Sequence, residues 1–281
     1  MPHTLFRVTV VENATIADNL RRLTLHAPEL ASHSLTGPDE FFGLIMPAIG
    51  ERFLPFTLED DNIRNIRAAV NAIDEDKRPA LRWYTIREHL PEKSCITVDI
   101  VTHGDNGPGS AWVLRAQPGQ EAGYYPGDTR WTPQLAPEQH SPQLLIADCS
   151  SAPALRSILE HKARHAPEDL ELSDVILVAE AAHTEDLISA HSLPTTFEPG
   201  FAEEWEARLR SLNITYQAKI EDTLKELYGD AGTKLSHPTS MWVCGEGELA
   251  KQARRYAINS LGVDAEHIVW IPFWLFGRPR P

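Results

Sequence analysis

The spacing of apolar residues changes part-way along the chain, and this change constrains the fold more than any other feature. In the first half, apolar residues form short runs bounded by Pro, Gly, Asp or Asn, which is typical of antiparallel strands joined by turns. Beyond a proline-rich seam at 132–142 (TPQLAPEQHSP), apolar strands alternate with segments of helical spacing. This alternation indicates a parallel sheet covered by helices. The sequence therefore predicts two domains, 1–135 and 142–281, the first all-β and the second α/β.

Individual elements follow from the same patterns. We expect strands in the first half at 5–11, 20–25, 41–46, 81–86 and 96–101, with a polar excursion at 59–78. In the second half we expect strands at 143–148, 174–180, 214–218, 241–244 and 267–271. Helices are expected at 154–165, 201–212, 220–227 and after strand 241–244, ending at about 261.

Composition excludes several classes of function. With 26 Lys+Arg against 40 Asp+Glu, the net charge of −14 argues against nucleic acid as a partner. No apolar run approaches the roughly 20 residues of a membrane span, and the N-terminal segment lacks a signal-peptide pattern. Three cysteines without a CxxC pair, and histidines without HExxH spacing, indicate no metal site. We expect a soluble, cytoplasmic monomer.

The segment RWYTIR, from Arg82 to Arg87, is the most informative motif of the first half. Two arginines supply charge for a pyrophosphate, and Tyr84 with Thr85 supplies an aromatic face and a hydroxyl for a flat ring. Side chains alternate along a strand, so Arg82, Tyr84 and Ile86 share one face. A barrel strand with solvated arginines remains the alternative interpretation.

A glycine-rich loop, HGDNGPG, follows at 103–109 and leads into a predicted helix at 110–116. Free backbone N–H groups and the positive end of a helix bind anions. The alternative is a turn that needs glycine for positive φ angles.

Together these motifs carry a family resemblance. R-x-Y-T-x-R, then D-x-V-x-H-G and G-P-x-S-x-W, resembles the FAD-binding half of the siderophore-interacting proteins. These are flavin-dependent ferric-siderophore reductases built like ferredoxin–NADP reductases. In the second half, ADCSSAPA at 147–154 is similar to the family's GDETALPA, WVCGE at 242–246 to W-x-x-G-E, and FWLFG at 273–277 to YWRxG.

The resemblance implies an antiparallel six-stranded β-barrel that binds FAD, followed by an α/β domain that binds a nicotinamide nucleotide. Arg82 would hold the FAD phosphates, and Tyr84 and Thr85 would lie against the isoalloxazine. The full set of implied cofactor-binding residues is Arg82, Trp83, Tyr84, Thr85, Arg87, Asp99, Val101, His103, Gly107, Gly109, Ser110, Trp112, Asp148, Ser150 and Ser151. Gly245 and Glu246 would lie on the nicotinamide side.

The implied activity is reduction of a ferric siderophore or another ferric chelate, with release of Fe(II) and electrons from NAD(P)H. Two departures bear on the acceptor: the family's siderophore-gripping lysine is Gly43 here, and the arginine of YWRxG is Leu275. Arg52, Arg130 and Arg278 are the candidate replacements, with solvated surface charges as the alternative. The acceptor alternatives are a less anionic chelate, a haem or a redox protein. A redox-silent flavin-containing binding protein is the third interpretation.

The electron donor depends on the end of the second strand of the α/β domain. NADP recognition normally needs Arg or Lys there, and the segment VAEAAH contains Glu180 instead. This favours NADH, with a ferredoxin as the alternative donor. The segment CGEGELA at 244–250 contains GxGxxA, but only one predicted strand follows it, so we interpret it as a glycine turn rather than a Rossmann fingerprint.

Overall fold

The computed structural model describes residues 5–48, 51–54, 65–102, 104, 107–132, 140–179, 193, 200–217, 219–229 and 237–277. The chain divides into two compact units, Met1–Thr129 and Arg130–Pro281. The predicted domain limits, 1–135 and 142–281, stay a prediction because residues 133–139 lie outside the described part. No helix within the described part is long and apolar enough to cross a bilayer.

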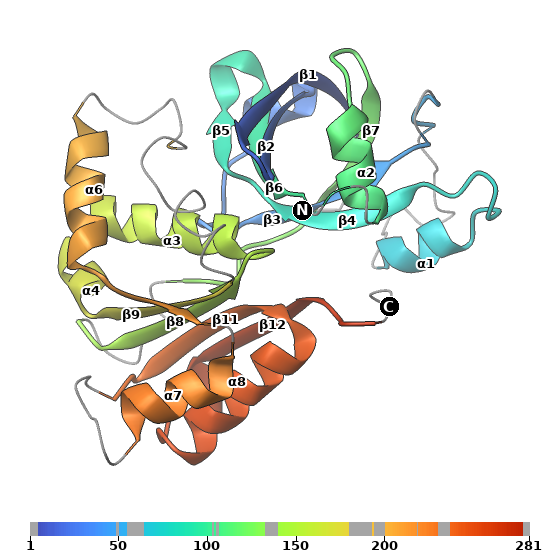
Figure 1. The fold of residues 1–281 in the computed structure, drawn as a ribbon. Helices are drawn as coiled ribbons and strands as arrows, with labels where there is room; N and C mark the ends of the chain where they lie inside the picture. The colour runs from blue at the N-terminus through green and yellow to red at the C-terminus, as the bar shows by residue number, and fades with distance from the viewer. Residues whose placement is uncertain are drawn as a thin grey trace. The chain divides into compact units, whose positions relative to one another are not determined.

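Unit 1 is built on one antiparallel sheet, whose strands are ordered β4-β3-β7-β1-β2-β6-β5 (Figure 1). The strands are β1 Phe6–Ala17, β2 Leu20–His26, β3 Phe41–Met46, β4 Ala80–Thr85, β5 Glu88–Leu90, β6 Cys95–Val101 and β7 Glu121–Pro126. Two helices accompany them, α1 Ile66–Asn71 and α2 Pro108–Arg115. The antiparallel sheet predicted from the sequence is confirmed.

The number of strands differs from the six expected, because the segment 80–90 bends and contributes two strands. Its first half, β4, pairs with β3, and its second half, β5, pairs with β6. At the bend, the Ile86 N–H donates to Glu40 O and the Arg87 N–H donates to Thr97 O, both at 2.8 Å. The two edge strands of the sheet are therefore consecutive in the chain, and no continuous strand pairing closes the described sheet into a barrel.

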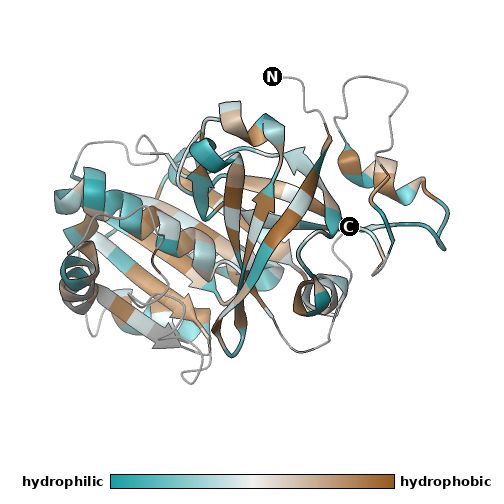
Figure 2. Cartoon of the chain, turned by 90° about the horizontal axis from the view of Figure 1, so that it is seen from above, coloured by the Kyte–Doolittle hydropathy of each residue, from teal (hydrophilic) through white to brown (hydrophobic). Residues whose placement is uncertain are grey.

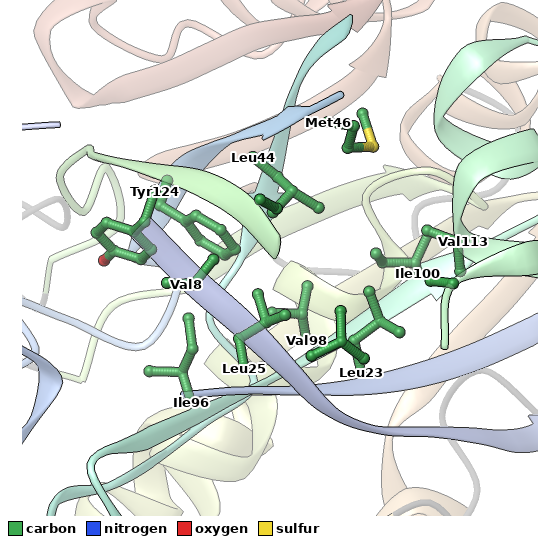
Figure 3. Close-up of a cluster of buried hydrophobic side chains, with 14 of the residues drawn as sticks. Val8, Leu23, Leu25, Leu44, Met46, Ile96, Val98, Ile100, Val113 and Tyr124 are labelled. Carbon is green, nitrogen blue, oxygen red and sulfur yellow. The ribbon is translucent and has the colours of Figure 1, made fainter. Parts of the chain in front are cut away.

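The core of unit 1 lies on the inner face of this sheet. Aliphatic side chains from alternate positions of the strands point toward one another, as expected from the two-residue period of a strand (Figure 3). Helix α2 adds Trp112 and Val113 to this core. The side chain of Asn13 on β1 fixes the end of α2 by donating to Val113 O (2.7 Å) and Ala116 O (2.9 Å). This satisfies carbonyls that the end of a helix leaves unpaired.

Unit 2 is built on a parallel sheet with the order β10-β9-β8-β11-β12 (Figure 1). The strands are β8 Gln143–Asp148, β9 Ser173–Val178, β10 Asn213–Gln217, β11 Ser240–Glu246 and β12 Ile268–Trp274. The helices are α3 Ala152–His165, α4 Pro167–Glu171, α6 Phe201–Ser211, α7 Ile220–Tyr228 and α8 Gly247–Asn259. Every predicted element of this half is present within a few residues of its expected limits, so the α/β prediction is confirmed.

Helices cover both faces of the parallel sheet, α3 on one and α7 with α8 on the other (Figure 1). The central strands are hydrophobic while the covering helices carry hydrophilic outer residues (Figure 2). Leu144, Ile146 and Val243 on the sheet pack with Leu224 of α7 and Ala253 of α8. A parallel sheet buried on both faces needs such continuous apolar strands.

A buried polar cluster lies where the strands of unit 2 begin. Lys162 of α3 is 3% exposed, and its Nζ donates to Ser173 Oγ (2.6 Å) and Gln143 Oε1 (3.1 Å). Gln143 also accepts from Trp131 Nε1 and donates to Ser240 Oγ. Burial lowers the pKa of Lys162 to about 8, against an opposing effect of Asp169.

This lowered pKa predicts a pH-dependent contribution to stability. Between pH 8 and 10.5 the unfolded chain holds a proton on Lys162 that the folded chain has released, so the free energy of unfolding should rise with pH in that window. The rise should total about 3 kcal/mol relative to Lys162→Met, measured by urea unfolding across the window. Lys251→Met, at an exposed lysine of α8, is the control and should give no such difference. Parallel curves for the protein and Lys162→Met would contradict the prediction.

Candidate functional site

Strand β4 presents the residues of the RWYTIR motif on opposite faces, as its alternation predicts. Arg82 is exposed, while Tyr84 is half-buried and packs against the core of unit 1. Trp83 points to the other face, where it lies 5.4 Å from the Phe41 ring and 6.0 Å from the Tyr125 ring. Burial raises the pKa of Tyr84 to about 12, although the charge of Arg82 opposes this. The Tyr84 hydroxyl is therefore a neutral donor at physiological pH.

The start of helix α2 lies directly against this strand. Gly107 precedes the helix with a φ of +90° and, as the N-cap residue, has no side chain to cap it, and Pro108 is the first helical residue. A Cβ on Gly109 would lie 2.6 Å from the Tyr84 hydroxyl oxygen and 3.4 Å from Cγ of Arg82. Glycine is required at position 109 because the Tyr84 side chain lies too close to the backbone there for a Cβ atom. The positive end of the helix thus lies beside the stem of Arg82, whose guanidinium donates to Leu81 O at 2.7 Å, and this combination favours an anion.

A second feature of this region is an unpaired donor. Trp112 is 2% exposed, and its Nε1 has no hydrogen-bond partner among the described residues. Buried indole N–H groups normally find an acceptor. The unpaired N–H of Trp112, in the second turn of α2, is consistent with a ligand or chain segment that supplies this acceptor. The predicted glycine-rich anion loop thus has its helix, and Ser110 follows Gly109 in its first turn.

Arg87 and Asp99 lie in a buried ion-pair network. The Asp99 carboxylate accepts two hydrogen bonds from Arg22, at 2.6 and 2.7 Å, and lies 3.3 Å from Nε of Arg87. The side chains of Asp99 and Arg87 are each 2% exposed. This geometry supports a structural role, in which β2, β6 and the bend after β4 are tied together. Arg22 was not singled out from the sequence.

The remaining predicted residues of unit 1 are dispersed. Thr85 is buried at the end of β4, and Val101 is half-buried at the end of β6. His103 lies outside the described residues, as do Glu180 and Arg278 of unit 2. The Arg52 side chain is 84% exposed and lies 3.9 Å from Glu121. Arg130, the first residue of unit 2, is also exposed.

Unit 2 brings its predicted residues together at the carboxyl end of the parallel sheet. Asp148, the last residue of β8, is 7% exposed. Its Oδ1 accepts from Ser150 N (2.8 Å), Ser150 Oγ (2.6 Å) and Ser151 N (3.2 Å). Ser151 precedes α3 but does not cap it with its side chain; its hydroxyl donates to Cys244 O at 2.7 Å instead.

Gly245 and Glu246 complete this edge from the neighbouring strand β11. Gly245 has a φ of +141°, and a Cβ there would lie 2.6 Å from the Asp148 carboxylate. The Glu246 N–H donates to Asp148 Oδ2 at 2.7 Å. Glu246 also caps α8, accepting from Glu248 N (2.7 Å) and Leu249 N (3.0 Å). The segment 244–250 is therefore a glycine turn from strand to helix, followed by one further strand, β12.

Comparison with known families accounts for both units. Residues 9–126 match the siderophore-interacting FAD-binding domain, and residues 140–277 match the siderophore-interacting protein domain. The chain belongs to the siderophore-interacting protein family. The resemblance of the sequence motifs is thereby confirmed, and unit 1 is the FAD-binding domain of this family.

Individual siderophore-interacting proteins and their relatives are similar along most of the chain. The ferric vibriobactin reductase ViuB of Vibrio cholerae is 26% identical over 216 residues, which are 76% of this chain and 71% of that protein. The NADPH-dependent ferric-chelate reductase of Escherichia coli is 25% identical over 252 residues, 88% of this chain and 84% of that one. The crystal structure of a siderophore utilization protein from T. fusca superposes with a TM-score of 0.67 and 22% identity, covering 99% and 95% of the two chains.

The predicted ferredoxin reductase-like fold of this family member is confirmed by its structural neighbours. Its residues also fit FAD: an uncapped helix start and an arginine suit the pyrophosphate, and Tyr84 supplies an aromatic face. Two long-range contacts of these residues are not predicted from the sequence, Arg22 with Asp99 and Trp274 with Asp148. Both join residues far apart in the chain, and no local pattern signals them.

The contact between Gly109 and Tyr84 predicts a coupled pair of substitutions. Gly109→Ala should lower the free energy of unfolding by about 1–3 kcal/mol, because the added methyl group overlaps the Tyr84 hydroxyl. Tyr84→Phe in the Gly109→Ala background should restore most of the loss, since the next atom of the ring lies 3.9 Å away. Urea unfolding of both single variants and the double variant measures the coupling. Additive losses would show that the close approach does not determine the glycine.

Proposed function

We propose that this protein is an FAD-dependent reductase that passes electrons from NAD(P)H to ferric iron held in a siderophore or similar chelate. One NAD(P)H supplies two electrons and therefore reduces two ferric ions to Fe(II). Fe(II) binds hard oxygen ligands more weakly, so the metal is released. We propose that the protein acts as a cytoplasmic monomer, with a ferredoxin as the alternative donor.

The observation that carries the proposal is the convergence of Arg82, Tyr84 and the start of α2 in a chain with this family's FAD-binding domain. When bound, FAD supplies the redox chemistry that joins a two-electron donor to a one-electron acceptor. Arg82 would pair with the pyrophosphate, and the N-terminal amides of α2 near Gly109 and Ser110 would donate to it. Tyr84 would lie against the isoalloxazine. Thr85, buried at the end of β4, would add a hydroxyl.

The carboxyl end of the parallel sheet supports the donor side of the proposal. Nucleotides bind there in open α/β sheets, and Asp148, Ser150, Gly245 and Glu246 meet at that edge. No acid–base pair is required of the protein, because the transferred electrons and proton come from the nucleotide. The E. coli relative is named for NADPH, whereas the acidic Glu180 favours NADH, so both donors belong in the test.

Two positions favour a second candidate acceptor. A Cβ on Gly43 would lie 3.0 Å from Leu81 and 3.5 Å from both Trp83 and Tyr125, so this position is covered by apolar side chains. Leu275 packs over Gly247 at the start of α8. Neither position supplies a cation, which reduces the attraction for a highly charged ferric chelate. A chelate of low charge, or a haem or redox protein served by a flavin reductase, fits these positions better than a ferric catecholate.

Arg82→Ala tests the cofactor site. Loss of a charged contact with the pyrophosphate should raise the dissociation constant of FAD by about tenfold to a hundredfold. Flavin content after gel filtration, and titration of the apoprotein with FAD, measure the change. Arg115→Ala, at an exposed arginine in the last turn of α2, is the matched control and should retain the cofactor. Full flavin occupancy in Arg82→Ala would remove Arg82 from the site.

The activity is tested on the purified protein under anaerobic conditions. We expect a two-banded flavin spectrum that bleaches on addition of NADH or NADPH, given in separate samples. Addition of ferric chelates of graded charge should restore the spectrum, with two Fe(II) trapped per nucleotide oxidised. A bleached protein that no ferric chelate reoxidises would favour the haem or redox-protein acceptor. A colourless protein that FAD cannot reconstitute would overturn the proposal.

A further inference from the structure

The order of the strands in unit 2 marks one position on its sheet. From β8 the chain proceeds outward to β9 and β10, then returns to form β11 and β12 on the other side of β8. Strands β8 and β11 are therefore neighbours from which the connections run in opposite directions. At such a switch point the loops after the two strands diverge and leave a crevice at the carboxyl ends, where ligands of open α/β sheets bind. Asp148 is the last residue of β8 at this point.

The Asp148 carboxylate joins three separate segments there. Its Oδ1 accepts from the turn that begins α3, and its Oδ2 accepts from Glu246 N on β11 at 2.7 Å. Oδ2 also accepts from Nε1 of Trp274, at the end of β12, at 2.9 Å. Every one of these partners is a donor, so a carboxylate, whose two oxygens both accept, can satisfy all of them, whereas an amide has only one accepting oxygen.

Trp274 is held in place by its edge while its ring remains accessible. The side chain is 41% exposed even though its indole N–H is bonded to a buried carboxylate. Glu246 Oε1 accepts from the Phe276 N–H at 3.1 Å, which fixes the chain just beyond Trp274. The rings of Trp274 and Phe276 lie 6.5 Å apart at 60°. A large aromatic ring that is fixed and exposed at a ligand-binding edge is suited to stack on a planar ring.

The charge of this edge selects among planar rings. The Asp148 carboxylate lies at the N–H edge of the indole, and Glu246 is the register partner of Trp274 on the neighbouring strand. A nicotinamide ring becomes cationic as it gives up two electrons and a proton, and the face of an indole whose N–H is bonded to a carboxylate stabilises that charge. The same carboxylates disfavour an anionic ferric chelate.

We propose that Asp148 is a positioning residue that fixes the indole of Trp274 as the stacking surface for the nicotinamide ring of the electron donor. This inference rests on the proposed function, in which NAD(P)H is the donor. When bound, FAD would supply the acceptor for the two electrons and the proton that the nucleotide gives up, while Asp148 and Trp274 would hold its nicotinamide ring.

Binding of NAD⁺ and of NADP⁺ to the FAD-loaded protein, measured by titration calorimetry, tests the inference without turnover. Asp148→Asn and Trp274→Ala should each raise the dissociation constant of the preferred nucleotide by about tenfold. The double variant should be no weaker than either single variant, because both remove one and the same surface. Trp274→Phe keeps an aromatic ring but loses the N–H donor, and should give a smaller loss.

Asp264→Asn is the matched control, since Asp264 also accepts a backbone N–H in unit 2, from Glu266, but is exposed. It should bind nucleotide as the unaltered protein does. In the control Asp264→Asn, oxidation of the dithionite-reduced protein by a ferric chelate should also stay within twofold of the unaltered rate. A purely structural role of Asp148 would slow this reaction and lower flavin content as well.

Unchanged nucleotide affinity in Asp148→Asn, or losses that multiply in the double variant, would overturn the inference. If Asp148→Asn does not fold, unchanged affinity in Trp274→Ala has the same meaning. Failure of the proposed function is recognised separately. A protein that binds the nucleotide but never reduces a chelate loses its assigned acceptor, while the role of Asp148 still stands or falls on the binding data.

Discussion

The segment from Ala80 to Leu90 is the constraint on which unit 1 depends. One half pairs with β3 and the other with β6, so this single segment forms both edges of the sheet. Such an arrangement is stable only if the polar groups at its bend are satisfied, because unpaired buried backbone groups are costly. Glu40 O and Thr97 O accept the two N–H groups there. Since Arg82 and Tyr84 precede the bend, the element that joins the sheet edges also orients the candidate cofactor site.

Buried carboxylates have a comparable role in both units. Asp99 compensates Arg22 and Arg87 in unit 1, and Asp148 accepts from three segments in unit 2. A carboxylate has two oxygens and several lone pairs, so one residue can satisfy donors from different elements at once. Removing it would leave buried donors or charges without compensation, which costs more than the net contribution of the bonds themselves. Asp99 and Asp148 therefore stabilise contacts between separate elements, a role that the net charge of −14 does not reveal.

Local pattern was sufficient to predict most of the fold. Strand 143–148, which is buried on both faces, and helices α3, α6, α7 and α8 followed from the spacing of apolar residues, whereas α4 was not predicted. The short strands β5 and β7 were missed. β5 has three residues, too few for a period, and the Gly-Tyr-Tyr of β7 lies beside turn residues. The sheet has seven strands rather than the expected six because the segment 80–90 bends between β4 and β5. That bend depends on pairing with β3 and β6, which no local sequence pattern indicates.

The candidate site residues likewise divide into those with a local sequence signal and those without one. The glycine-rich loop and the RWYTIR strand are local signals, and the structure brings them together through the contact of Gly109 with Tyr84. Asp99 lay in a motif that matched, yet its actual partner Arg22 is 77 positions away and is identified only once β2 and β6 are paired. Asp148 and Trp274 are 126 positions apart and meet because the strand order places β8 and β12 on either side of β11. A motif indicates which residues are candidates for the site. The topology of the sheet determines which partners they contact, and therefore whether they bind a ligand or position another residue.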